Sequence, residues 1–419
     1  MASHWAKKAF LAGLGDLADG ELHVECAERT YRFGGRSDLS ATIRVHDERF
    51  FRHALAGADI GMGESFMDGD WTTPDLVSLT RLALRNRRVL DRQGRVIGLL
   101  KRIVAAAARR RRDNSRARSR RHIRHHYDLG NEFFGLFLDS ALQMYSSAYF
   151  GSDHETLEAA QTRKVERLCH ALDLGPGDRV LEIGSGWGGF ARWAAGRYGC
   201  RVTTATISDE QFRHIREWQA AAGEAGSRVE ALCADYRELS GQFDKIVSIE
   251  MFEAVGRRHY DEYFAAIERL LAPDGVMAMQ TITVSDQWFP RYHGSPDWIE
   301  AYIFPGGELA AIGEILGSLA RVTSMSLHAA ESFGTHYART LQLWRGRFHE
   351  QLPRVRALGF DERFVRMWDF YLATCEAAFL ERHTSVHQLV FAKNGTRRRL
   401  FNEPWCEAAL DAVREASAA

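Results

Sequence analysis

VLEIGSGWGGFA, residues 180–191, decides the fold, because it runs from an apolar strand through a glycine-rich turn into a helix. Glycine lets the backbone approach a ligand closely, and the first turn of a helix presents unpaired N–H groups to it. Gly184, Gly186 and Gly188 give G-x-G-x-G spacing. A dinucleotide-binding fold instead has G-x-G-x-x-G, with an acidic residue about 20 residues later. The stretch therefore predicts a nucleotide site of another kind; a purely structural turn in a different α/β enzyme is the alternative.

Outside this stretch the chain alternates between strands and helices. Strands are expected at 179–183, 201–206, 229–233, 245–249 and 276–283, and helices at 157–172, 189–197, 209–222 and 260–271. Such alternation predicts right-handed crossovers and a parallel sheet. Two later strands are expected near 321–327 and 386–392, with a long helical insertion at about 337–383 between them. The predicted fold class is α/β and Rossmann-like, with a small, mainly helical N-terminal domain.

Polar residues at the ends of the first three strands indicate which nucleotide binds. Glu182, two residues before Gly184, is placed to meet the amine end of S-adenosylmethionine (SAM). The second strand does not end in an acid that could bind a ribose, and the segment 206–211 offers hydroxyls and an amide instead. Asp235 and Tyr236 follow the third strand and are candidates to hold adenine by a hydrogen bond and ring packing. A plain core role is the alternative for Tyr236.

Composition excludes several classes of protein. The formal net charge of zero argues against a general nucleic-acid binder. The six cysteines have no C-x-x-C spacing, and His122, His125 and His126 have no acidic or cysteine partners at ligand spacing, so we expect neither disulfides nor a metal site. The chain begins without an apolar signal region and has no run of about 18 apolar residues. These features predict a cytoplasmic protein whose membrane contact is peripheral.

An arginine-rich segment divides the chain. Nine of the sixteen residues 109–124 are arginine. The segment is interpreted either as a solvated linker or as a contact with anionic lipid headgroups, to which each basic residue contributes about 1 kcal/mol. The expected domains are therefore 1–108, the linker 109–124, and a catalytic domain at 125–419. Within the first domain, Pro74 and Asp75 predict the start of a helix over 76–84.

Several long motifs in order carry a resemblance to a known family. They are HHYDLGNEFFGLFLD (125–139), MYSSAYF (144–150), VLEIGSGWGGFA (180–191), ATISDEQ (205–211), ADYREL (234–239), IVSIEMFEAVG (246–256), YIFPGGELA (302–310) and FGTHYARTLQLW (333–344). The chain resembles the cyclopropane-fatty-acyl-phospholipid synthase family, which includes the mycolic-acid cyclopropane synthases. The resemblance covers nearly the whole chain, because GADIGMGESFMDGDW (57–71) is similar to that family's small lipid-associated domain.

The resemblance implies a class I SAM-dependent methyltransferase fold and a reaction at a lipid. Such enzymes add a one-carbon unit from SAM across a cis double bond of an acyl chain, usually within a membrane phospholipid. It implies that the late insertion forms an acyl tunnel and that the protein works at the inner membrane face; a homodimer is left open. By the match, SAM contacts fall on Tyr145, Ser146, Gly184, Gly186, Thr206, Gln211 and Tyr236.

The resemblance also implies where a catalytic base is held. In the family that base is a bicarbonate ion bound by a cysteine, a glutamate, a histidine, an isoleucine backbone and a tyrosine. The matching positions here are Ser147, Glu253, Gln280, Ile282 and Tyr337. Serine and glutamine in place of cysteine and histidine can still hydrogen-bond an anion. The two replacements together leave open whether this chain binds bicarbonate. Glu253 could alternatively cap a helix, and Glu250 has no assigned role.

The product and two rival functions follow from these substitutions. A cyclopropane ring is the favoured product because Glu253 and Tyr337 remain to organise a base; a methylene- or methyl-branched chain is the alternative. The aromatic residues Phe133, Phe134, Tyr149, Phe252 and Tyr337 would stabilise a carbocation, or would simply form core. The rivals are a methyltransferase for a small soluble acceptor and a SAM- or lipid-binding accessory protein with a degenerate catalytic site.

Overall fold

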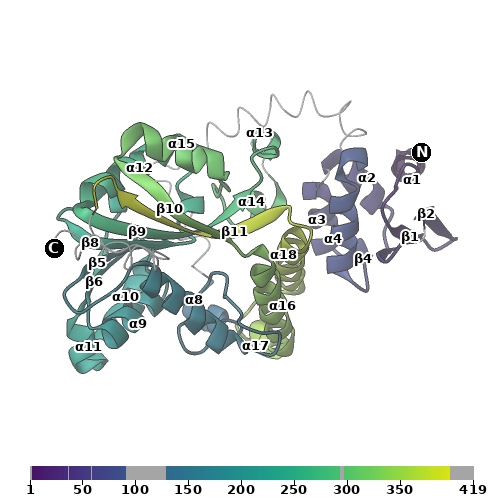
Figure 1. The fold of residues 1–419 in the computed structure, drawn as a ribbon. Helices are drawn as coiled ribbons and strands as arrows, with labels where there is room; N and C mark the ends of the chain where they lie inside the picture. The colour runs from purple at the N-terminus through teal and green to yellow at the C-terminus, as the bar shows by residue number, and fades with distance from the viewer. Residues whose placement is uncertain (1, 36, 58, 91–128, 293–296, 397–419) are drawn as a thin grey trace. The chain divides into compact units, whose positions relative to one another are not determined.

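The computed structural model describes residues 2–35, 37–57, 59–90, 129–292 and 297–396 (Figure 1). The chain folds into two compact units that interleave along the sequence. Unit 1 comprises Met1–Asp139, Ile282–Ile312 and Phe333–Val386. Unit 2 comprises Ser140–Thr281, Gly313–Ser332 and His387–Ala419.

Unit 2 is built on a seven-stranded sheet with the order β10-β11-β9-β8-β5-β6-β7. Its strands are β5 (Arg179–Ile183), β6 (Arg201–Thr206), β7 (Val229–Cys233), β8 (Phe243–Ile249), β9 (Leu271–Val284), β10 (Met325–Ser332) and β11 (Thr384–Lys393). The pairs β5–β6, β5–β8, β6–β7 and β8–β9 are parallel, whereas β10 and β11 are antiparallel. The predicted parallel sheet is therefore confirmed for β5 to β9, and the antiparallel pair β10–β11 completes the sheet.

Helices cover both faces of this sheet, as Figure 1 shows. One face carries α8 (Leu157–Ala171), α9 (Gly189–Tyr198), α10 (Asp209–Ala221) and the short α11 (Gly223–Ser227). The other carries α12 (Tyr260–Leu270) and α15 (Ile312–Val322). Because β5 is covered on both faces, Val180, Leu181 and Ile183 are all buried. Glu182 is the one polar residue in that buried run, so the fold singles it out.

Two side-chain caps fix where the helices beside the expected site begin. Thr156 Oγ1 accepts from Ala159 N at 3.3 Å at the start of α8, and Ser208 Oγ accepts from Gln211 N at 3.4 Å at the start of α10. A cap of this kind stabilises a helix by about 1 kcal/mol. Both helix starts, at Leu157 and Asp209, agree with the prediction from the sequence.

The late part of the sequence differs from the prediction at one place. A strand was expected at about 321–327, but α15 extends to Val322 and β10 begins at Met325. Ile315, Ser318 and Leu319 are buried at helical spacing, so the helical period continues further than predicted. The expected strand near 386–392 is β11, and the helical insertion before it is confirmed.

The N-terminal part of unit 1 mixes helices with a four-stranded sheet of order β2-β1-β3-β4. Its elements are α1 (Ala2–Gly13), β1 (Glu21–Glu25), β2 (Thr30–Gly34), β3 (Ser40–Val45), α2 (Arg49–Gly57), α3 (Asp59–Met67), β4 (Trp71–Thr72) and α4 (Leu76–Arg85). Asp75 caps α4 by accepting from Val77 N and Ser78 N, which confirms the helix start predicted there.

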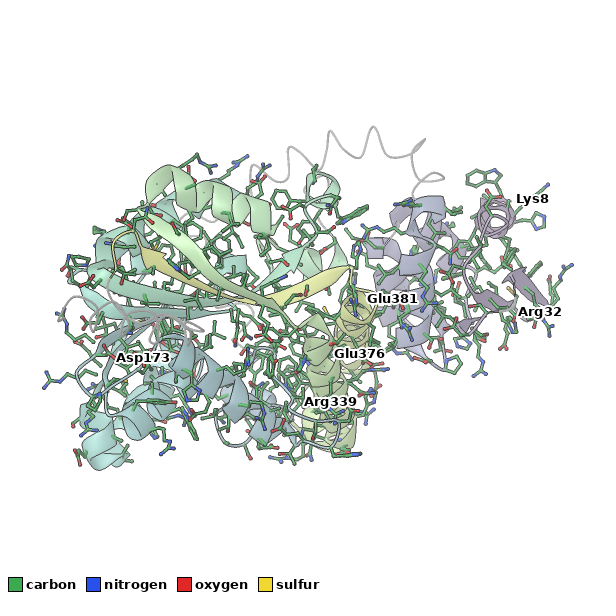
Figure 2. The ribbon with its side chains drawn as sticks, viewed as in Figure 1. Lys8, Arg32, Asp173, Arg339, Glu376 and Glu381 are labelled. Carbon is green, nitrogen blue, oxygen red and sulfur yellow. The ribbon has the colours of Figure 1, made fainter. Side chains whose placement is uncertain are left out.

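The rest of unit 1 is helical. It contains α7 (Asn131–Gly135), α13 (Phe289–Tyr292), α14 (Trp298–Tyr302), α16 (Gly334–Glu350), α17 (Leu352–Ala357) and α18 (Glu362–Leu380). Helix α18 packs against α16, α3 and α4. Just after its end, the Glu381 carboxylate labelled in Figure 2 accepts from Arg81 Nε at 2.6 Å and Arg85 Nε at 3.0 Å. The insertion thus packs with N-terminal helices rather than forming a separate body.

The domain limits expected from sequence follow chain order, whereas the compact units interleave. The arginine-rich linker 109–124 lies outside the described residues. The division into 1–108, 109–124 and 125–419 therefore stays a prediction. Within the described ranges, no helix combines the length and apolar character that crossing a membrane requires.

Candidate active site

The glycine turn after β5 has the geometry that a closely bound ligand requires. Gly184, Gly186 and Gly188 have φ values of 92°, 51° and 80°, which side chains other than glycine rarely adopt. Gly184 N and Ser185 N donate to Ala205 O at 3.0 and 3.2 Å, which ties the turn to the end of β6. A Cβ atom added to Gly186 would meet no heavy atom within 4 Å. The turn therefore borders open space beside the start of α9, as a nucleotide site needs.

Glu182 is a buried carboxylate next to this turn, with only 2% of its surface exposed. Thr204 Oγ1 lies 2.5 Å from Glu182 Oε2 and 2.7 Å from Ser185 Oγ. Burial raises the pKa of Glu182 to about 8, while the Thr204 hydrogen bond and the positive charge of Lys164 oppose that rise. A buried carboxyl group with a raised pKa is suited to bind an ammonium group, because the nearby positive charge would favour its ionised form.

Two fully buried polar residues of α8 hold the segment that contains Tyr145 and Ser146. Lys164 Nζ donates to Ser146 Oγ at 2.7 Å, and Gln161 Nε2 donates to Ser146 O at 2.8 Å. Neither α8 residue was identified from the sequence. The signal that could have found them is a polar pair three residues apart on an otherwise apolar helix face, where both side chains must be satisfied in the core. Tyr145 itself is half-buried.

The loop after β6 contains the two predicted contacts Thr206 and Gln211. Both are buried, and Thr206 Oγ1 donates to Gln211 Oε1 at 2.8 Å. Ser208 N donates to Thr206 Oγ1 at 3.1 Å. The predicted hydroxyls and amide thus lie together at the carboxyl ends of the strands, where open α/β sheets bind their ligands.

Asp235 and Tyr236, the predicted adenine contacts, follow β7 in this same region. Asp235 Oδ1 accepts from Arg237 N at 3.0 Å and from Arg237 Nε at 2.8 Å, and Asp235 Oδ2 accepts from Nη2 at 2.7 Å. The Tyr236 ring is half-buried and meets the buried Tyr263 ring edge-on at 5.3 Å. The carboxylate is therefore anchored by Arg237, and the role of the pair in holding adenine stays a prediction.

Ser147 and Gln280, two of the predicted base-holding residues, lie together. Both are fully buried, and Gln280 Nε2 donates to Ser147 O at 3.2 Å. The Ser147 hydroxyl donates to Ala148 O at 3.0 Å. Glu253 belongs to the same unit, and its Oε1 accepts from the Thr281 hydroxyl at 3.1 Å. Three of the five predicted base-site residues thus belong to unit 2.

Glu250 joins this group, although the sequence assigned it no role. Its Oε1 accepts from Ser147 N at 2.8 Å and from Gln280 Nε2 at 2.8 Å. Its backbone has a φ of 49°, in the left-handed region that disfavours residues with a Cβ. Gln388 Nε2 on β11 in turn donates to Gln280 Oε1 at 3.0 Å. The signal in the sequence was an acid directly after the apolar strand β8.

The two remaining base-site residues, Ile282 and Tyr337, belong to unit 1. Ile282 lies on β9 and is half-buried. Tyr337 lies on α16, is buried, and has its ring 4.5 Å from that of Phe379 and 6.1 Å from that of Trp344. Their share in a base site stays a prediction.

The aromatic residues proposed to stabilise a cation make core contacts. Phe133 is fully buried, and its ring lies 4.9 Å from Trp368 within an aromatic cluster of unit 1. Phe252 is fully buried against Tyr260 at 4.5 Å. The Tyr149 ring is covered on one side by the Arg167 guanidinium at 4.0 Å. These contacts fit the core-packing alternative.

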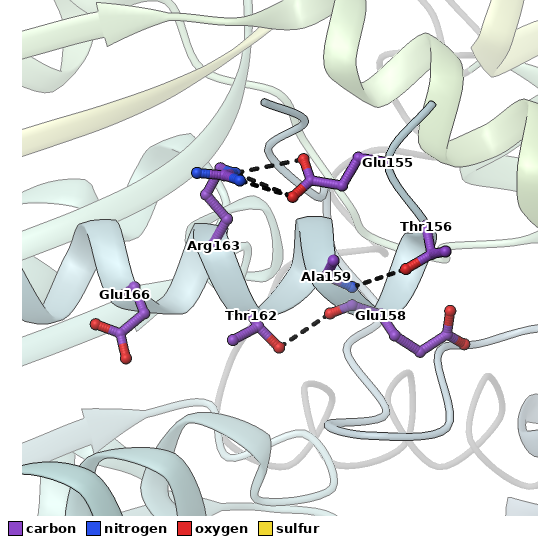
Figure 3. Close-up of a pocket in the computed structure, with 7 residues that line it drawn as sticks. All are labelled: Glu155, Thr156, Glu158, Ala159, Thr162, Arg163 and Glu166. Atoms are coloured by element: carbon purple, nitrogen blue, oxygen red, sulfur yellow. Dashed lines mark hydrogen bonds and ion pairs between the residues drawn. The ribbon is translucent and has the colours of Figure 1, made fainter. Parts of the chain in front are cut away.

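Figure 3 shows an open depression along the outer face of α8. It is lined by Glu155, Thr156, Glu158, Ala159, Thr162, Arg163 and Glu166. An ion pair between Arg163 and Glu155 at 2.8 Å crosses it. None of the predicted site residues lines this depression, so it is separate from the site described above.

The seven-stranded sheet and the glycine turn beside a buried acid define a class I SAM-dependent methyltransferase. A sequence model of the family described as mycolic acid cyclopropane synthetase matches residues 114–389. The protein belongs to this family, and it is a SAM-dependent methyltransferase of the cyclopropane-fatty-acyl-phospholipid synthase type.

Known relatives are similar over most of the chain. The tuberculostearic acid methyltransferase UfaA1 of Mycobacterium tuberculosis is 40% identical over 355 residues, 83% of this chain and 81% of the relative. The cyclopropane-fatty-acyl-phospholipid synthase of Escherichia coli K12 is 38% identical over 362 residues, 85% of this chain and 90% of the relative. The solved cyclopropane synthase CmaA1, in complex with SAH, is 32% identical with a TM-score of 0.61, covering 65% of this chain and 98% of that one.

Proposed function

We propose that the protein transfers a one-carbon unit from SAM to the cis double bond of an unsaturated acyl chain in a membrane phospholipid, most often closing a cyclopropane ring. The observation that carries the proposal is the placement of two neighbouring residues. Ser146, a proposed SAM contact, is fixed by Lys164, and Ser147, a proposed base-site residue, is bound by Glu250. A methyl donor and a base would therefore be held by two adjacent residues of one short segment.

The proposed roles of the unit 2 residues follow from their chemistry. SAM supplies an electrophilic methyl group on a sulfonium. Glu182 would hold the ammonium group of SAM. The glycine turn would let SAM approach the protein backbone closely. Tyr145, Thr206, Gln211, Asp235 and Tyr236 would complete the nucleotide contacts. An alkene is a weak nucleophile, so the protein must hold both reactants at near-attack distance and then direct the loss of a proton.

The substrate class is supported by the relatives. One similar protein is named for acyl chains in phospholipids and another for tuberculostearic acid. These names favour a lipid acceptor over a small soluble one. They also keep a methylene- or methyl-branched product as the second candidate, because Ser147 and Gln280 replace the cysteine and histidine that the resemblance implies.

Expression in a bacterial host that lacks such an enzyme tests this proposal. Fatty acyl esters from that host should gain one CH2, and upfield ring protons in the NMR spectrum should report a cyclopropane. Vinyl protons with the same mass gain would establish the branched alternative. An unchanged acyl profile, with the chain expressed and able to bind SAM, would contradict the proposal and favour the accessory-protein rival.

We further propose a peripheral membrane contact on the inner face, made by the arginine-rich segment 109–124 and the N-terminal region. Segment 109–124 lies outside the described residues, so the argument rests on charge alone. Each neutralised arginine should remove about 1 kcal/mol of attraction to anionic vesicles. Replacing four of the nine by glutamine should weaken binding to such vesicles at low salt, and unchanged binding would contradict it.

A further inference from the structure

We propose that the base of this reaction is the Glu250 carboxylate, built into the chain, and that no bicarbonate ion is bound. The inference rests on the proposed function and deepens it. Its starting point is a disagreement between the residues present and the bicarbonate site that the resemblance implies.

At two of the five positions expected to bind bicarbonate, a donor is already bound to a carboxylate. Ser147 N and Gln280 Nε2 both donate to Glu250 Oε1, each at 2.8 Å. The Ser147 hydroxyl donates instead to the Ala148 carbonyl at 3.0 Å. The carboxylate oxygen accepts from these donors as an oxygen of bicarbonate would. Glu250 therefore occupies the hydrogen-bonding role that the ion has in the implied site.

The orientation of the Gln280 amide is set by its surroundings. Its NH2 group faces Ser147 O at 3.2 Å, and a carbonyl oxygen can only accept. Its oxygen faces Gln388 Nε2 at 3.0 Å. The amide must therefore present N–H groups, and not its oxygen, to Glu250. An ionised carboxylate is the partner that this arrangement favours.

Charge argues against a second anion at the same donors. A bicarbonate about 4 Å from Glu250 would be repelled by about 4 kcal/mol at an effective dielectric constant of about 20. That repulsion corresponds to roughly a thousandfold loss of affinity.

The backbone at Glu250 is the second, independent sign of function. Its φ of 49° costs a residue with a Cβ about 1–2 kcal/mol relative to glycine. A non-glycine residue held in such a conformation next to a reactive site is a mark of a functional constraint. Glycine would relieve the strain at this position but would remove the carboxylate.

The chemical step balances without another reactant. Once the methyl group has joined one carbon of the double bond, the other carbon is cationic. A Glu250 oxygen takes a proton from that methyl group, and the electron pair of the broken C–H bond closes the ring. The resulting carboxylic acid then releases the proton to water, which restores the carboxylate.

The test compares wild type, Glu250→Gln and Glu250→Gly in CO2-free buffer, with unsaturated phospholipid vesicles and SAM, before and after adding bicarbonate. Wild-type turnover should be the same with and without bicarbonate. Glu250→Gln should lose about 100-fold or more, the usual contribution of a general base. Glu250→Gly should be similarly slow and should regain at least tenfold when bicarbonate is added, because the vacated donors can then bind it.

A binding measurement gives a readout independent of turnover. Titration of [13C]bicarbonate, followed by the width of its NMR signal, should show binding to Glu250→Gly and none to wild type. Asp173→Gly is the matched control, because Asp173 has a φ of 47° and precedes β5, at the opposite end of the strands (Figure 2). It should relieve backbone strain as Glu250→Gly does, with unchanged turnover.

The outcomes separate the two proposals. Wild-type turnover that falls at least tenfold without bicarbonate, wild-type binding of [13C]bicarbonate, or a Glu250→Gln rate within threefold of wild type would each overturn the built-in base while leaving the function intact. Absence of any one-carbon product from wild type, at every bicarbonate concentration, would instead overturn the proposed function together with the inference that rests on it.

Discussion

Gln280 Nε2 donates to Glu250 Oε1 at 2.8 Å. Gln388 on the neighbouring strand β11 donates to Gln280 Oε1 and so fixes the orientation of the Gln280 amide. Two hydrogen bonds in series thus connect Gln388 on β11 to the Glu250 carboxylate after β8: Gln388 donates to Gln280, and Gln280 donates to Glu250. They connect three residues that are far apart in sequence and leave the carboxylate half-buried.

Gln388 is therefore expected to be a positioning residue. Gln388→Leu should lower kcat about tenfold, equivalent to about 1.4 kcal/mol, with unchanged affinity for SAM. Gln388→Glu should lower kcat further, because a carboxylate cannot donate to Gln280 Oε1 and would turn the amide oxygen toward Glu250. A purely structural role predicts the opposite order, since glutamate matches the shape of glutamine better than leucine does. Steady-state rates with both variants decide between them.

We expect SAM binding to need the missing side chain of Gly186 as well as its backbone conformation, because SAM would occupy the space beside it. Gly186→Ala should destabilise the fold by about 1–2 kcal/mol and weaken SAM binding at least tenfold, because the new methyl group enters the open space beside the turn. Gly223→Ala is the matched control, since Gly223 has a similar φ of 55° and also has no heavy atom within 4 Å of an added Cβ. Equal SAM affinities of the two variants, measured by calorimetry, would contradict this role.

Lys164 should act on SAM binding as well as on stability. Lys164→Met removes the donor to Ser146 Oγ and the positive charge that opposes the raised pKa of Glu182. We expect a loss of about 1–3 kcal/mol in the free energy of unfolding and about tenfold in SAM affinity. Lys245→Met is the control, because Lys245 is also fully buried but donates to the Leu172 carbonyl. It should lose stability alone; a matching loss of SAM affinity would count against a specific role for Lys164.

Glu182 should release a proton when SAM binds. With its pKa raised to about 8 by burial, it is mainly protonated at pH 7, and an ammonium group at its side favours the ionised form. Binding at pH 7 should therefore release close to one proton, and affinity should rise from pH 6 to pH 8. Calorimetry in buffers of different ionisation enthalpy measures this number. Glu182→Gln should release none, and a wild-type value near zero would refute the assignment.

Much of the fold could be predicted because its signals are local. The strands β5, β6 and β7 are apolar runs with turn residues at both ends, and their limits were predicted correctly. Thr156 and Ser208 mark helix starts by their own side chains. The interleaving of the two units could not be predicted, because it depends on α18 packing against helices nearly 300 residues earlier in the chain.

The site was predictable only where one residue type reveals its role. Glu182 stood out as a charge within an apolar strand, and the glycine turn through its spacing. Lys164 was missed because its partner Ser146 lies outside its own helix, and Glu250 because Ser147 lies 103 positions before it. Only the folded structure brings such pairs together.

The proposed function is tested most directly by incubating the purified 419-residue chain with [methyl-13C]SAM and vesicles of a phospholipid with cis-unsaturated acyl chains. The proposed function predicts that the 13C label appears in the fatty acyl chains, in a ring CH2 group for the cyclopropane product, with one S-adenosylhomocysteine released per label. Vesicles with saturated acyl chains should take up none. Binding of SAM without label in the unsaturated chains, or equal labelling of saturated lipid, would contradict the proposed function.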